Sequence, residues 1–156
     1  MARAKKSPFT IIKGISWAVL PLVAGLFVIV EALNKTGMTQ QLSLLLNHIV
    51  SRSETAAIWL NGSVVAFACN LMNNLPAGLI AGSVIQSGHT PEMVKSAVLI
   101  GVDLGPNLSI TGSLATILWL VALRREAQEV KAWTFLRLGS VIMTTALIIT
   151  LLSLWI

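Results

Sequence analysis

The sequence has few of the residue types from which catalytic and metal sites are usually built. It contains one cysteine, Cys69, which excludes an intrachain disulfide and any metal or metalloid site that needs several thiolates from one chain. The two histidines, His48 and His89, have no further ligands at metal spacing. No phosphate-binding loop, nucleophile elbow or zinc motif is present. These absences argue against an enzyme, a bound cofactor and a metal centre.

Charge is also scarce, at 11% of the 156 residues, whereas 55% are hydrophobic and the mean hydropathy is +0.82. This composition is far from that of soluble domains and indicates a membrane protein surrounded by lipid. The net charge of +5 does not indicate a nucleic-acid partner, because the basic residues lie between apolar runs and form no continuous face. We therefore expect one membrane domain, residues 1–156.

Two segments, residues 15–33 and 138–156, each have about the 20 apolar residues that a membrane-spanning helix needs. Both are expected to be full spans. Residues 38–50 also carry apolar side chains at helical spacing, but this segment is too short to cross. We expect it to lie at the membrane interface or to cap the helix bundle.

Residues 56–85 are apolar overall, but their centre, CNLMNNLPAG, contains asparagines and a proline. Asn73 or Asn74 can cap a new helix, and Pro76 can occupy one of its first positions. Each arm then has about 11 to 14 residues, which is half a membrane thickness. The pattern predicts a helical hairpin.

A second interruption lies in residues 91–123, where VDLGPNLSITG divides an apolar run. Thr90 and Pro91 predict a helix start, with Thr90 as the N-cap and Pro91 at the first helical position. We expect this helix to reach about Leu104, to break at GPNLSITG, and to continue as a half-helix over about residues 113–123. The segment is therefore predicted to be a broken transmembrane helix.

The distribution of basic residues distinguishes two ways of threading the middle of the chain. If residues 56–85 form a re-entrant hairpin that enters and leaves on one side, eight of the eleven basic residues share one side of the membrane, whereas a single crossing divides them five against six. The positive-inside rule favours the hairpin, a cytoplasmic N-terminus and an external C-terminus in a multi-pass protein of the cytoplasmic membrane. The eight are Arg3, Lys5, Lys6, Lys13, Arg124, Arg125, Lys131 and Arg137, and the other three are Lys35, Arg52 and Lys95.

The two interruptions together predict a transport site. Unwound backbone at membrane depth is tolerated only when it is buried in protein or lines a wet cavity. Half-helix N-termini present free amide N–H groups there, and unwound carbonyls present acceptors. The candidate substrate-binding side chains are neutral donors and acceptors that suit a small oxygen-bearing solute or an ion: Asn73, Asn74, Asn107, Ser109, Thr111 and Ser113.

Asp103 is the acidic residue within the broken helix. An ionised carboxylate near the bilayer centre costs at least about 2.5 kcal/mol, so its presence there needs a reason. One reason is proton coupling or another role in the site, and the other is a structural pairing that holds the break together. Capping of the half-helices is the corresponding alternative for the asparagine and hydroxyl side chains. Cys69 is expected to be a small buried apolar side chain.

The motifs NNLPAG and GVDLGPNLSITGSLATILWLVALRRE resemble the arsenite and antimonite efflux permeases of the ion transporter superfamily. The resemblance covers nearly all of this chain but only the C-terminal part of a family member. It implies an all-α membrane protein of two inverted repeats, each combining a re-entrant hairpin with a broken helix, of which one repeat is visible here. It further implies extrusion of arsenite or antimonite by proton exchange, with a soluble arsenite-stimulated ATPase as partner in some systems.

Several interpretations remain open from the sequence. The chain could be a fragment, one half of a split transporter, or the subunit of a homodimer. A non-transporting remnant or subunit that needs a missing half is the rival to a transport domain. An anion or dicarboxylate transporter on the same scaffold is a third hypothesis, which the lack of basic residues in the break weakens.

Overall fold

The computed structural model describes residues 17 and 19–156, and every regular element in this part of the chain is a helix. The predicted all-α class is therefore confirmed for the described residues. The beginning of the predicted span 15–33 lies outside them. The elements are α2 (Val19–Lys35), α3 (Met38–Arg52), α4 (Glu54–Met72), α5 (Asn74–Gln86), α6 (Glu92–Leu104), the 3-10 turn η1 (Gly105–Asn107), α7 (Leu114–Arg125), α8 (Ala132–Leu152) and the 3-10 turn η2 (Ser153–Trp155).

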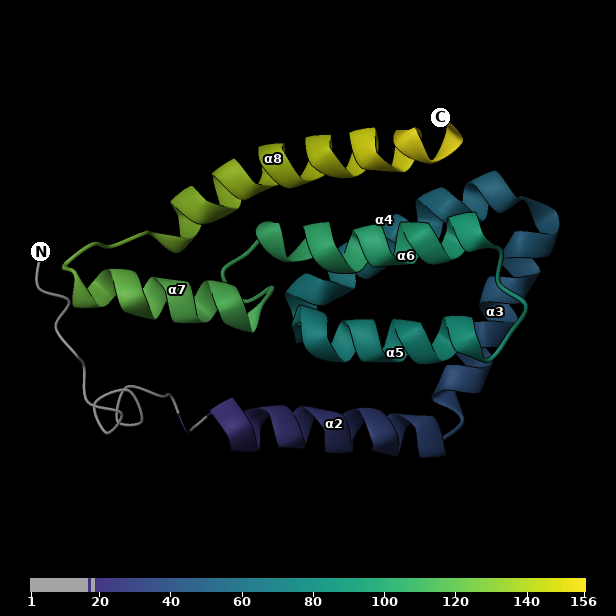
Figure 1. Cartoon of the computed structure of the whole chain (residues 1–156), viewed down its shortest axis with the longest axis horizontal. Coiled ribbons are helices and arrows are strands. Elements are labelled where there is room, and N and C mark those ends of the chain that lie inside the picture. The colour runs from purple at the N-terminus through teal and green to yellow at the C-terminus, as the bar shows by residue number, and fades with distance from the viewer. Residues whose placement is uncertain (1–16, 18) are drawn as a thin grey trace, which may run out of the picture.

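Most helices run along the long axis of the molecule, and α3 crosses one end of it (Figure 1). We call this end the α3 end, and the end where α7 connects to α8 the opposite end. Helices α4 and α5 form an antiparallel hairpin that starts and finishes at the α3 end. Helices α6 and α7 follow one another along the axis on either side of η1, and α8 returns beside them. In this arrangement α3 caps the bundle, which is one of the two positions predicted for it.

The closest helix packing is between α4 and α6, and small residues make it possible. A Cβ atom added at Gly101 would lie 2.5 Å from the carbonyl oxygen of Gly62, and one at Gly105 would collide with the backbone of Ala66. Beside this seam, the apolar core continues into α8 through buried Met143, Leu147 and Leu151. Because α4, α6 and α8 share this core, they form the framework on which the interruptions are held.

Two runs of the described chain, Glu54–Met72 and Ala132–Trp155, are long and apolar enough to cross a membrane by length and composition. The C-terminal helix begins at Ala132, ahead of the predicted boundary at 138. Helix α4 has 19 residues, so the first hairpin arm is longer than the predicted 11 to 14, whereas α5 has 13. The helix begins at Glu54, where Ser53 is the N-cap and accepts from the N–H of Ala56, and it continues without a break to Met72.

The predicted N-cap of α6 is wrong. Pro91, not Thr90, occupies the N-cap position, and the helix begins at Glu92. Pro91 has ψ of 148°, an extended conformation, and Glu92 places a carboxylate in the first turn, where the helix dipole favours it. The hydroxyl of Thr90 is buried and has no hydrogen-bond partner among the residues that the structure describes.

Candidate functional site

The break in the second half of the chain lies where the Gly-Pro pair predicts it. Helix α6 ends at Leu104, η1 makes one tight turn, and α7 begins at Leu114. Ser113 is the N-cap of α7, and its Oγ accepts a hydrogen bond of 3.1 Å from the backbone N–H of Thr116. Since Ser113 is buried in this role, its described contacts are those of a helix cap.

The tip of the hairpin is a second interruption, centred on Asn73. This residue has φ of 77° and ψ of 151°, a backbone conformation that is rare for any residue except glycine. Its Oδ1 accepts a hydrogen bond of 3.3 Å from the N–H of Leu75 and caps α5. The predicted cap is therefore present. Strain of this kind costs on the order of 1–3 kcal/mol and persists only where surrounding contacts enforce it.

The hairpin tip and the break are in direct contact. The N–H of Asn74 donates to the carbonyl of Gly112 at 2.8 Å, and the Asn73 Nδ2 donates to the carbonyl of Thr111 at 3.3 Å. These pairs are 38 residues apart in sequence. The structure thus brings together Asn73, Asn74 and Thr111, with Asn74 contributing its backbone.

Asn70, which was not among the predicted site residues, lies at the centre of this contact. Its Nδ2 donates to the carbonyls of Ala66 and Gly105 at 2.9 and 2.8 Å. Its Oδ1 accepts from the Ser109 Oγ at 2.8 Å, and its backbone carbonyl accepts from the Thr111 Oγ1 at 3.3 Å. In the sequence it lies only three and four residues before Asn73 and Asn74, in the same polar interruption.

Three polar residues in or directly before the break are exposed on this chain: Asp103, Asn107 and Thr111. The Asn107 Nδ2 donates to the carbonyl of Leu104 at 3.0 Å, near the end of α6. The carboxylate of Asp103 has no hydrogen bond or ion pair with any residue that the structure describes. The alternative in which Asp103 holds the break together through a structural partner has no matching contact among the described residues. The proton-coupling role of Asp103 stays a prediction.

Helix α8 supports the break from behind. A Cβ atom added at Gly139 would lie 2.8 Å from the carbonyl oxygen of Leu108 and would collide with that of Asn107. Glycine at this position allows α8 to lie directly against η1 and the residue after it. The break is consequently enclosed by the hairpin tip on one side and by α8 on another.

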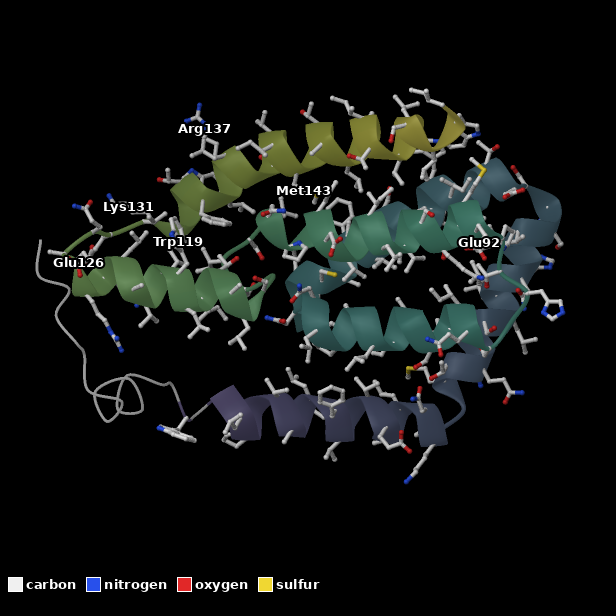
Figure 2. All side chains as sticks on the ribbon, in the orientation of Figure 1. Glu92, Trp119, Glu126, Lys131, Arg137 and Met143 are labelled. Atoms are coloured by element: carbon white, nitrogen blue, oxygen red, sulfur yellow. The ribbon has the colours of Figure 1, made fainter. Side chains whose placement is uncertain are left out.

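Charged groups lie mainly at the two ends of the molecule. Figure 2 shows Glu126 and Lys131 at the opposite end and Glu92 at the α3 end. Glu92 pairs with Lys95 at 2.7 Å, and Glu31 pairs with Lys35 at 3.7 Å. In the described part of the chain, no three His, Cys, Asp or Glu side chains are grouped so as to hold a metal ion. The tip and the break can therefore offer a solute amides, hydroxyls, backbone groups and one carboxylate.

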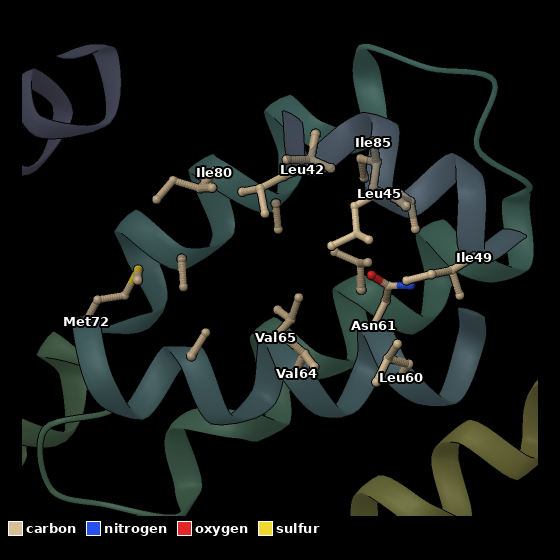
Figure 3. Close-up of a pocket in the computed structure, with 16 residues that line it drawn as sticks. Leu42, Leu45, Ile49, Leu60, Asn61, Val64, Val65, Met72, Ile80 and Ile85 are labelled. Carbon is tan, nitrogen blue, oxygen red and sulfur yellow. The ribbon is translucent and has the colours of Figure 1, made fainter. Parts of the chain in front are cut away.

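A separate cavity of about 270 Å³ lies between α3, α4 and α5 (Figure 3). Apolar side chains line it, and Asn61 is the polar exception. Because the Asn61 Nδ2 already donates to Ala57 at 2.7 Å, the walls offer little to a polar solute. This cavity does not include the break, and the candidate polar site is therefore the contact between hairpin tip and break.

Comparison with known proteins places this arrangement in a family. An arsenical pump membrane protein of Escherichia coli is 31% identical over 148 residues, and one of Yersinia enterocolitica is 30% identical over 148 residues. An uncharacterised transporter of Mycobacterium tuberculosis is 26% identical over 151 residues. Each match covers 92% of this chain but 34% or 35% of the relative, so the chain spans about a third of the length of the curated relatives it matches.

No solved structure matches the chain. The family model for the arsenical pump membrane protein, in contrast, matches residues 2–156, which include the hairpin, the break and both flanking helices. The resemblance carried by NNLPAG and by the longer motif is thereby confirmed. This chain belongs to the arsenical pump membrane protein family.

Proposed function

We propose that this chain is the C-terminal transport domain of a secondary transporter that extrudes arsenite or antimonite across the cytoplasmic membrane in exchange for protons. The observation that carries the proposal is the hydrogen-bonded contact between hairpin tip and break, Asn74 N to Gly112 O at 2.8 Å, in a chain of the arsenical pump family. It brings two helix N-termini, those of α5 and α7, close to one unwound segment.

The chemistry of the site suits the proposed substrate. Arsenite and antimonite near neutral pH are small neutral trihydroxy molecules, so each hydroxyl can donate and accept a hydrogen bond. Asn107 and Thr111 present an amide and a hydroxyl on the exposed side of the break. Among the described residues of the break there is no lysine or arginine, so nothing specific favours an anion or dicarboxylate as substrate.

In the proposed topology, α4 and α5 form a re-entrant hairpin, α6 and α7 form the broken span, and the N-terminus is cytoplasmic. Helix α5 has 13 residues and is too short to cross a membrane. Arg124 and Arg125 end α7 at the opposite end, whereas Lys35 and Arg52 end α2 and α3 at the α3 end. The described basic residues are thus separated as the hairpin threading requires.

Asp103 is proposed to couple protons to the substrate. It lies in the last turn of α6, directly before the break, and it is exposed without a described partner. A carboxylate in that position can bind and release a proton without disturbing an ion pair. Efflux is further proposed to need a second repeat, supplied by another part of the protein, a partner half or a second copy. A soluble arsenite-stimulated ATPase is an optional partner.

Uptake of arsenite into everted membrane vesicles containing the chain, driven by an imposed proton gradient, tests the proposed function. We expect little uptake from the chain alone. On co-expression with a complementary half, we expect uptake that requires the gradient and is inhibited by antimonite but not by succinate. Gradient-driven succinate uptake without arsenite uptake would contradict the proposal and favour the dicarboxylate alternative.

A further inference from the structure

Asn70 differs from the other asparagine of α4 in what its side chain reaches. Asn61 and Asn70 each donate from Nδ2 to the carbonyl four residues earlier, at 2.7 and 2.9 Å. Among the described residues, the Asn61 side chain makes this local bond and no other. Asn70 adds bonds to Gly105 and Ser109, which are 35 and 39 residues away in sequence.

The additional bonds connect two groups of the break to α4, a distant part of the chain. Gly105 begins η1, so its carbonyl lies where the regular helix of α6 has ended. Within the break that carbonyl accepts from the N–H of Leu108 at 3.1 Å, and the Asn70 amide adds a hydrogen bond from outside the break. The same amide accepts from Ser109 through Oδ1, so its donor and acceptor both hold the unwound segment.

Packing fixes the Asn70 side chain in this position. A Cβ atom added at Gly112 would lie 2.8 Å from the Asn70 Oδ1, so the chain passes the amide as closely as glycine allows. Gly105 is likewise pressed against the backbone of Ala66, one turn before Asn70. The side chain therefore has little freedom to turn away from the break.

We propose that Asn70 is the positioning residue of the transport site, which sets the unwound segment 105–112 against the hairpin tip. In this proposal Asn70 does not contact the substrate. It acts through Gly105, Ser109 and Thr111. Losing its amide leaves the Gly105 carbonyl and the Ser109 hydroxyl with partners inside the break alone, Leu108 and Thr111. The break then loosens, and the groups that Thr111 and Asn107 present to a solute are no longer held at fixed positions.

Amide hydrogen exchange on the purified full chain in lipid nanodiscs tests this directly. We compare Asn70→Ala with Asn61→Ala, the matched control that loses the local bond alone. We expect Asn70→Ala to speed exchange at Asn74 and in segment 105–112 by about tenfold or more, equivalent to about 1.4 kcal/mol. Asn61→Ala should leave these amides unchanged. Exchange in α8 should be unchanged in both, which separates loss of position from loss of folding.

Ser109→Ala provides a second measurement because it removes one bond to Asn70 and keeps the bond to Gly105. It should speed exchange at Gly112 and should add little when combined with Asn70→Ala. If Asn70→Ala cannot be recovered folded, Ser109→Ala decides the matter by the same criterion. Folded Asn70→Ala or Ser109→Ala with unchanged exchange in segment 105–112 would overturn the proposal.

A transport measurement connects position to substrate, and this readout alone rests on the proposed function. In vesicles that take up arsenite, Asn70→Ala should raise the half-saturating arsenite concentration by about tenfold, whereas Asn61→Ala should not change it. An equal half-saturating concentration in the two variants would count against a positioning role. Absence of arsenite uptake by the unmodified chain together with its complementary half would instead contradict the proposed function and leave the exchange result standing.

Discussion

Asn73 combines an unfavourable backbone conformation with two useful side-chain bonds. Its φ of 77° strains any residue with a Cβ, while its side chain caps α5 through Leu75 and reaches Thr111. Glycine removes the strain and both bonds, whereas alanine removes both bonds and keeps the strain. The two substitutions therefore separate the contributions of backbone and side chain at the hairpin tip.

We predict that Asn73→Gly is more stable than Asn73→Ala by about 1 kcal/mol, because only alanine retains the strained Cβ. Thermal unfolding of the purified variants in detergent measures the difference. Both should transport less arsenite than the unmodified chain, since neither holds Thr111. Equal unfolding temperatures for the two variants would show that the tip relaxes its backbone when the side chain is lost.

Asp103 gives a prediction that concerns coupling and not stability. Asp103→Asn preserves the size of the side chain but removes its ability to gain or lose a proton. Because no described ion pair depends on the carboxylate, folding and membrane insertion should be normal. Proton-gradient-driven arsenite uptake into everted vesicles should be lost, with protein level checked by immunoblot.

Glu31→Gln is the control for Asp103→Asn, since Glu31 is an exposed acid that pairs with Lys35 at 3.7 Å, away from the break. It should leave gradient-driven uptake unchanged. Well-expressed Asp103→Asn with the usual dependence on the gradient would mean that coupling occurs at another residue. A loss of uptake in both variants would point to a general effect of removing negative charge.

The seam between α4 and α6 depends on the absence of side chains at a few positions. At Gly101 an added Cβ would meet the Gly62 carbonyl at 2.5 Å, which backbone cannot avoid without moving the helices apart. At Gly82 in α5, an added Cβ would meet nothing within 4 Å. These two helical glycines therefore differ in packing and share their backbone conformation.

We predict that Gly101→Ala destabilises the chain by about 1–3 kcal/mol or more through overpacking. Gly82→Ala should be neutral, or stabilising by up to about 1 kcal/mol through helix propensity. The unfolding temperature in detergent and the yield of folded protein distinguish these outcomes. If Gly101→Ala is as stable as the unmodified chain, α4 and α6 must be able to move apart at little cost, which would contradict the prediction.

The ends of helices could be predicted where the responsible residues are local. Gly105 and Pro106 stop α6, Ser113 starts α7, and Asn73 starts α5, because each acts within a turn of its own position. The length of α4 could not be predicted in the same way. The predicted arm has about 11 to 14 residues, whereas α4 has 19, and the polar Asn61 within it donates to Ala57 on its own helix.

The role of Asn70 lay beyond the sequence for a different reason. Its partners Gly105 and Ser109 are 35 and 39 residues away, so no spacing rule connects them. The predicted site residues nevertheless include Ser109 and Thr111, which Asn70 contacts, because hydroxyls in an apolar run are conspicuous. Sequence patterns thus identified the polar segments, and the fold was needed to show how they meet.

The threading of the whole chain through the membrane yields a prediction from the hairpin. Its first residue, Glu54, and its last, Gln86, both lie at the α3 end of the molecule. Single cysteines at these positions, in a Cys69→Ala background, should both react with a membrane-impermeant reagent added from outside intact cells. A cysteine at Arg125, at the opposite end, should react only after permeabilisation. Labelling of Glu54→Cys and Gln86→Cys from opposite faces would exclude the re-entrant hairpin.

In the membrane, the exposed polar residues of the break must be covered by something other than lipid. Asp103, Asn107 and Thr111 cannot face hydrocarbon without a large cost, so water or further protein must cover them in the membrane. Ile149 on α8 is 61% exposed and apolar, and it can face lipid.

A spin label at Asn107 should therefore show low collision rates with oxygen dissolved in lipid, whereas one at Ile149 should show high rates. Collision rates with a water-soluble nickel complex then distinguish water from further protein as the cover. A wet cavity admits the complex, whereas a protein interface does not. A label at Asn107 with the same lipid accessibility as Ile149 would mean that the break faces the bilayer, which is incompatible with a transport site there.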